Sequence, residues 1–163
     1  MSEGFSCPSP LSNVSDRIRL GHGGGGRLTN NLIENIFKPI FSNEYLDKLH
    51  DGAIIGLPKN KIAFTTDSYV INPIFFPGGD IGKLAVTGTI NDLAMCGARP
   101  KFLSLGLIIE EGFEIEKLKK ILNSIKTTAD KVGAMIVTGD TKVVNNGKGD
   151  GIYINTAGIG IIE

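Results

Sequence analysis

The residues best suited to chemistry are four aspartates that stand at the ends of expected strands or inside an expected helix. Asp51 precedes a strand, Asp67 ends one, Asp140 follows one, and Asp92 lies within a helix beside Asn91. Turn or cap chemistry is the simplest interpretation of any one of them. It explains Asp92 least well, because Asp is unfavourable inside a helix and this one has apolar neighbours. Together with glycine loops and lysines, the four carboxylates predict a site for Mg²⁺ and the phosphates of ATP.

Two familiar phosphate-binding motifs are only partly matched. Residues 21–26 fit G-x-G-x-x-G, but the four residues before them are too few and too polar for the first strand of a dinucleotide-binding fold. Residues 77–84 contain a Gly-Lys pair like that of a P-loop. There Pro77 replaces the first glycine and Leu84 replaces the metal-binding hydroxyl, so we reject both motifs.

Composition excludes several classes of protein. The 163 residues include 17 basic and 17 acidic side chains, a balance that argues against binding nucleic acid by phosphate neutralisation. Two cysteines are too few for a disulfide framework and favour a reducing, cytoplasmic setting. No apolar run reaches the roughly 18 residues of a membrane span, and the N-terminus lacks the apolar centre of a signal peptide.

The elements that must position the aspartates follow from hydrophobic periodicity and turn signals. Residues 1–26 are expected to be a flexible tail and a glycine-rich segment, and 27–163 a single domain. We expect helices at 28–40 (with Pro39 bending or ending it), 80–98 and 114–132, strands at 53–57, 61–66, 101–110, 134–137 and 152–162, an irregular or edge segment at 70–76, and a loop at 145–151. This order predicts an α+β fold: a mainly antiparallel sheet with helices on one face. Asp80 is the expected N-cap of the second helix.

Four stretches of sequence carry a resemblance to a known family. They are residues 75–86, residues 91–100 with the pattern Asn-Asp-x-x-x-x-Gly-Ala-x-Pro, residues 138–144 with Gly-Asp-Thr, and residues 154–160. They resemble the HypE family of carbamoyl dehydratases, which mature nickel–iron hydrogenases. The wider superfamily includes aminoimidazole ribonucleotide synthetase, selenophosphate synthetase and thiamine-monophosphate kinase. The resemblance runs from about residue 20 to the end of the chain.

The resemblance implies an N-terminal domain that binds ATP and Mg²⁺ in grooves near a homodimer interface made by joining two sheets into a barrel. The metal acids of the superfamily fall on Asp51, Asp67, Asp92 and Asp140, and Lys83 and Lys142 match basic, catalytic positions near the triphosphate. The implied nucleotide contacts are Gly23, Gly24, Gly25, Gly26, Lys83, Asn91, Asp92, Thr138, Gly139, Asp140 and Thr141. Residues 22–26 match a mobile segment that closes over the phosphates.

The family's reaction implies further partners. ATP phosphorylates the amide oxygen of a carbamoyl group held on a C-terminal cysteine, and loss of phosphate leaves a thiocyanate that supplies cyanide ligands. The implied partners are a carbamoyltransferase and an iron-centre scaffold protein. This chain stops at Glu163, before the family's second domain and terminal cysteine, so we expect an N-terminal domain that dimerises but does not complete the dehydration alone. Residues 50–53 read His-Asp-Gly-Ala where an Asp-Asp-Ala phrase is expected, which makes Asp51 the weakest ligand.

Other interpretations remain open from the residues alone. Cys7 near the N-terminus is compatible with a selenophosphate synthetase or another small-molecule kinase, although a cysteine in a tail is expected to be a bystander. Cys96 is expected in or near the core. A non-catalytic domain used for dimerisation or docking is the remaining alternative.

Overall fold

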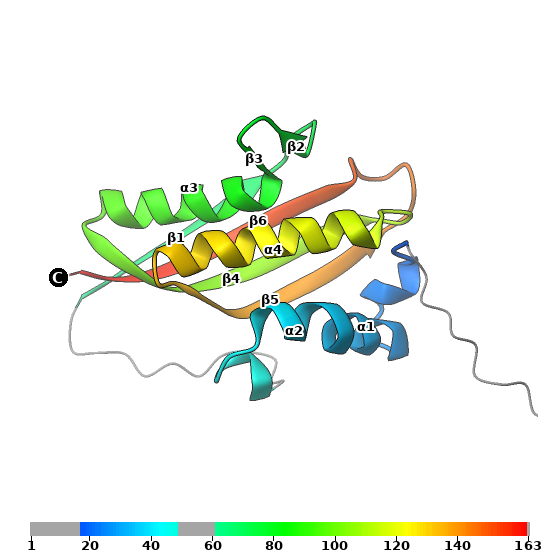
Figure 1. Cartoon of the computed structure of the whole chain (residues 1–163), viewed down its shortest axis with the longest axis horizontal. Coiled ribbons are helices and arrows are strands. Elements are labelled where there is room, and N and C mark those ends of the chain that lie inside the picture. The colour runs from blue at the N-terminus through cyan, green and yellow to red at the C-terminus, as the bar shows by residue number, and fades with distance from the viewer. Residues whose placement is uncertain (1–16, 49–60, 163) are drawn as a thin grey trace, which may run out of the picture.

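The computed structural model describes residues 17–48 and 61–162, and they form two main layers (Figure 1). One layer is a four-stranded sheet in the order β1-β6-β4-β5. Only the β4–β5 pair is parallel, which confirms the mainly antiparallel sheet. The strands of this sheet are β1 (Ile62–Tyr69), β4 (Ala98–Glu110), β5 (Met135–Val144) and β6 (Ile152–Ile162).

The second layer consists of α3 (Ile81–Met95) and α4 (Ile115–Lys131), which lie side by side on one face of the sheet (Figure 1). Asp80 caps α3 as expected, since its Oδ1 accepts hydrogen bonds from the backbone N–H groups of Gly82 at 2.7 Å and Lys83 at 3.0 Å. The two helices approach closely at Gly82, where an added Cβ would lie 2.7 Å from the carbonyl oxygen of Ile121. The expected helices at 80–98 and 114–132 are therefore confirmed, and they cover one face of the sheet as predicted.

The core lies between these helices and the sheet face that they cover. From Leu103 to Ile109 of β4 every second side chain is buried, and α4 contributes the apolar face that its periodicity predicts. A polar pair sits within this core: the hydroxyls of Thr89 and Thr156 are 2.5 Å apart, and Thr156 also donates to the carbonyl of Ala85. The core members from these elements include Leu103, Leu105, Leu107, Ile109, Leu118, Ile121, Leu122, Ile125, Ile152 and Ile154.

The N-terminal helical region packs beside β5, at the lower edge of the sheet in Figure 1. It contains a 3-10 helix (Leu20–Gly23), α1 (Arg27–Leu32), a π-helical turn (Ile33–Phe37), α2 (Lys38–Phe41) and a second 3-10 helix (Leu46–Lys48). The expected helix at 28–40 is confirmed, and Pro39 lies in the first turn of α2 directly after the π-helical turn.

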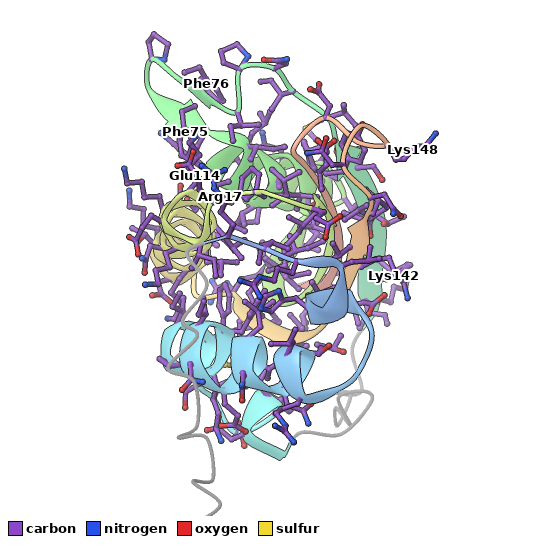
Figure 2. All side chains as sticks on the ribbon, turned by 90° about the vertical axis from the view of Figure 1, so that its right-hand side faces the viewer. Arg17, Phe75, Phe76, Glu114, Lys142 and Lys148 are labelled. Atoms are coloured by element: carbon purple, nitrogen blue, oxygen red, sulfur yellow. The ribbon has the colours of Figure 1, made fainter. Side chains whose placement is uncertain are left out.

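The expectation of a flexible tail over residues 1–20 is wrong for residues 17–20. Ile18 is 1% exposed and belongs to the core. Its backbone exchanges hydrogen bonds with Gly112 and Phe113, and Arg17 forms an isolated antiparallel bridge with Glu114, beside which it lies in Figure 2. A single anchoring residue produces no periodic pattern, so the sequence carried no signal for it. The rest of the segment, residues 20–26, forms a helical turn and its exit toward α1.

Two further expectations need correction. Asp67 and Asp140 lie inside β1 and β5, because each strand continues past its apolar stretch, with Asp67 on the helix-covered face and Asp140 on the opposite face. The expected irregular or edge segment at 70–76 is confirmed, and its end, β2 (Phe75–Phe76), pairs with β3 (Gly79–Asp80) in a small hairpin. Cys96 is exposed rather than in the core, because it follows α3 at the C-cap. The strand at 53–57, its hairpin with 61–66, Asp51 and Cys7 lie outside the described residues.

The loop at 145–151, which the structure confirms, is tied to the end of β4 by one carboxylate. Glu110 accepts hydrogen bonds from the backbone N–H groups of Gly147 and, at 3.0 Å, Gly151. These bonds, first that from Gly151 and then that from Gly147, hold the pKa of Glu110 below its ordinary value of 4.5. Loop 145–151 therefore depends on the charged form of Glu110.

This linkage predicts an acid-sensitive contribution to stability. The pKa is lower in the folded state, so Glu110 stabilises the protein fully above pH 4.5 and loses this effect as the pH falls through the folded-state pKa. Glu110→Gln should therefore lower the free energy of unfolding at neutral pH, and the difference from wild type should shrink on acidification. Urea denaturation at several pH values measures this difference in the free energy of unfolding. A difference between wild type and variant that stays the same at all pH values contradicts the account. Glu116→Gln, an exposed residue of α4, is the control.

Candidate functional site

Two of the predicted carboxylates meet where β1 passes α3. Asp67 pairs in register with Thr156, whose buried hydroxyl contacts α3, so the Asp67 side chain projects from the helix-covered face. Thr65 projects from the same face and donates a hydrogen bond to Oδ2 of Asp92 at 3.1 Å. Both carboxylates are on exposed residues. The structure thus brings Asp67 and Asp92 to one edge of the molecule, open to a ligand.

Tyr69 connects this acidic pair to the core. Its hydroxyl donates to Oδ2 of Asp67 at 2.7 Å, and a side chain at Gly88 would collide with it. Burial and then the hydrogen bond to Asp67 raise the pKa of Tyr69 to about 12, and the charges of Asp67 and Asp92 act in the same direction. Tyr69 and Thr65 were not predicted from the sequence, although each stands two residues from Asp67 and therefore shares its face of the strand.

A second group of predicted residues lies on β5, at the opposite edge of the sheet. Asp140 is in register with Gly106, which is in turn in register with Asn155, and this row projects from the face that α3 and α4 leave uncovered. Lys142 projects from the same face, and Figure 2 shows it pointing away from the helices. The Oδ1 of Asp140 accepts the backbone N–H of Thr141 at 2.9 Å. Thr138 and Gly139 precede them on the strand.

The glycine segment, residues 21–26, belongs with this second group. Gly23 lies against β5, where an added Cβ would be 2.5 Å from the backbone nitrogen of Val143. The side of the segment away from β5 is open, because a Cβ at Gly25 or Gly26 would meet nothing within 4 Å. Gly23 thus places the glycine segment against β5 at Val143, the residue after Lys142 in the sequence.

A single chain does not bring the two groups together. Asp67 and Asp140 lie on edge strands three strand spacings apart, about 14 Å, and project from opposite faces of the sheet. Within residues 17–48 and 61–162 no three His, Cys, Asp or Glu residues are close enough to hold a metal ion. The expected convergence of the carboxylates is thus seen for Asp67 and Asp92 but not for Asp140.

Lys83 stands apart from both groups. It is in the first turn of α3, and its Nζ donates to the carbonyl oxygen of Gly78 at 2.7 Å, beside the β2–β3 hairpin. Nine residues separate it from Asp92, which places the two about 14 Å apart along the helix. Asn91 is exposed next to Asp92 near the other end of α3. Asn91 therefore lies at the same end of α3 as Asp92, whereas Lys83 lies at the other end.

The uncovered face of the sheet has a small, polar centre with apolar side chains on either side. Asn155 at the centre donates to the hydroxyls of Thr66 and Ser68, at 3.3 and 3.0 Å. Phe64, 67% exposed, and Ile108 lie toward the two ends of the strands. None of the helices in the described part of the chain is long and apolar enough to cross a membrane.

Comparison with known protein families identifies the class of protein to which this fold belongs. Residues 49–162 match the model of the "AIR synthase related protein, N-terminal domain" family, and the chain belongs to that family. Within it, the chain is 51% identical over 154 residues to the carbamoyl dehydratase HypE of Azotobacter vinelandii, covering 94% of this chain and 45% of that protein. The chain thus spans less than half the length of the curated relatives it matches.

Solved structures give the same result. A crystal structure of the hydrogenase maturation protein HypE in complex with ATP superimposes with a TM-score of 0.86 at 49% identity, covering 89% of this chain and 43% of that one. A chain in a crystal structure of a HypE–HypF complex superimposes with a TM-score of 0.62 at 54% identity, covering 80% of this chain and 42% of that one. The resemblance seen in the sequence motifs is therefore confirmed.

The acidic pair predicts an alkaline titration that can be measured. Because the pKa of Tyr69 is about 12 in the folded state against 10.0 ordinarily, its stabilising effect is complete below pH 10 and is lost as the pH rises toward 12. Ultraviolet titration should show one late-ionising tyrosine. Asp67→Asn should make it ionise earlier but not normally, since burial, the larger cause, remains. Tyr153→Phe, on the uncovered face, should leave it unchanged; loss of the late component in that variant would contradict the assignment.

Proposed function

We propose that this chain is the ATP-binding and dimer-forming part of a HypE-like carbamoyl dehydratase of the cytoplasm. The observation that carries the proposal is the similarity of about half of all residues, over nearly the whole chain, to HypE proteins, one of them solved with ATP. In the proposed reaction a carbamoyl group on a C-terminal cysteine becomes a thiocyanate, the source of cyanide ligands for nickel–iron hydrogenase. The chain alone is proposed to bind the nucleotide without completing this reaction.

The donor set fits Mg²⁺. The carboxylates of Asp67 and Asp92 are hard oxygen ligands on exposed residues, and Mg²⁺ takes one or two carboxylates together with phosphate oxygens and water. Bound Mg²⁺ would neutralise charge on the phosphates during phosphoryl transfer. Asp140 and Asp51 are the further proposed ligands.

The residues beside β5 are proposed to hold the triphosphate. Backbone N–H groups of the glycine segment and of residues 138–141 would donate to phosphate oxygens, and the ammonium group of Lys142 would neutralise charge there. Lys83 keeps its proposed basic role, with less geometric support because it lies beside the β2–β3 hairpin. Exclusion of water matters in this reaction, since water would compete with the amide oxygen for the phosphoryl group.

The separation of the two groups has a consequence for assembly. We infer that a complete site forms between two copies, with Asp67 and Asp92 from one chain and Asp140 with Lys142 from the other. The uncovered sheet face, with its exposed Phe64 and Ile108, is the proposed dimer surface. The other proposed partners are a carbamoyltransferase, supported by the HypE–HypF complex of the relative, and an iron-centre scaffold protein.

Calorimetry with Mg–ATP tests the function. The chain should bind the nucleotide, and removal of Mg²⁺ by a chelator or the substitution Asp92→Asn should abolish binding while the dimer persists in sedimentation. Asp130→Asn, an exposed aspartate on α4, should bind like wild type. If wild type gives no magnesium-dependent heat, the chain is a dimerisation or docking module and the proposal fails.

Mixing two inactive variants tests assembly of the site between copies. Asp67→Asn and Asp140→Asn should each abolish Mg–ATP binding in their own homodimers. In the mixed dimer, one of the two sites receives the intact acidic pair from one chain and the intact Asp140 from the other. Binding should therefore return to half of the wild-type stoichiometry in that dimer. If each site were built within one chain, both sites of the mixed dimer would stay defective.

A further inference from the structure

The glycine segment is closed into a loop by one side chain of α1. The hydroxyl of Thr29 accepts the backbone N–H of Gly25 at 2.9 Å and donates, at a longer 3.5 Å, to the carbonyl oxygen of Gly21. One hydroxyl thus joins the two ends of a five-residue stretch, Gly21 to Gly25. Gly25 has a φ of 73°, a conformation that glycine adopts without penalty.

A second contact holds the start of the segment. His22 is 6% exposed, and its Nδ1 accepts the backbone N–H of Arg19 at 2.9 Å. Gly23, the next residue, lies against Val143 of β5 with no room for a Cβ. The inner side of the segment is therefore anchored by His22 and Gly23. On the outer side, Gly24 donates a long backbone hydrogen bond to Gly21 and the carbonyl of Gly26 accepts the N–H of Asn30, while Thr29 supplies the side-chain contact, at Gly25.

An unrestrained run of glycines would sample many conformations, and a ligand that needs one of them would have to order the run on binding. The Thr29 hydroxyl removes that cost in advance. It holds the open side of the segment in one conformation between β5 and the start of α1.

We propose that Thr29 is a positioning residue for the triphosphate, acting through the glycine segment and not by contact with the nucleotide. This role rests on the proposed binding of Mg–ATP. Loss of one such hydrogen bond corresponds to about a five- to tenfold change in affinity.

Two substitutions separate the hydroxyl from the shape of the side chain. Thr29→Val keeps the shape and removes both hydrogen bonds, whereas Thr29→Ser keeps the hydroxyl. Thr29→Val should weaken Mg–ATP binding about five- to tenfold and speed amide-proton exchange at Gly25, without lowering the urea midpoint. Thr29→Ser should behave like wild type in both measurements. Thr128→Val, which removes a hydroxyl bound to the carbonyl of Ser124 on α4, is the matched control and should bind normally.

The outcomes distinguish this role from the proposed function. If wild type binds Mg–ATP and Thr29→Val binds equally well, the positioning role is overturned and the function stands. If wild type does not bind, both are overturned. Equal weakening by Thr29→Val and Thr29→Ser also overturns the role, because the hydroxyl would then not be responsible. Should Thr29→Val fold poorly, Thr29→Ala removes the same hydroxyl and gives the same readouts.

Discussion

The alternation of side chains along the strands is the constraint on which the rest of this structure depends. On β4, the residues that pack beneath α3 and α4 are leucines and isoleucines, so the residues between them must project from the other face. The same rule divides the acids: Asp67 shares a face with buried Thr156, and Asp140 shares the opposite face with Asn155. A sheet with one filled face thus carries two separate groups of polar side chains at its two edges.

In the proposed function, that division links the chemistry of the chain to its assembly into a dimer. The acidic pair has the ligands for a metal ion but lacks basic groups, while the β5 group has Lys142 and the glycine segment but only one acid. Each half supplies what the other lacks for holding a magnesium–triphosphate complex. The polar centre and apolar ends of the uncovered face give a second sheet something to pack against. In this proposal, function therefore depends on how the uncovered sheet faces of two copies pack against each other.

Local signals in the sequence were sufficient for the helices. The apolar stripe of α4 and the Asp80 cap of α3 depend only on residues close together in the sequence, and both helices are found where expected. Signals that depend on distant partners were not readable. The strand character of Asp140 comes from pairing with β4, the burial of Ile18 comes from Gly112 and Phe113, and the face of Asp67 is set by pairing with Thr156, far along the chain. The acids were identifiable by type, but their distribution over two faces was not.

The central claim, that one chain contributes half of the nucleotide site and a second copy the rest, is tested most directly by a crystal structure of this chain with Mg²⁺ and a non-hydrolysable ATP analogue. The account predicts a dimer in which the metal and phosphates contact Asp67 and Asp92 of one copy and Asp140 and Lys142 of the other. A nucleotide held by residues of a single copy, or bound to a monomer, would contradict it.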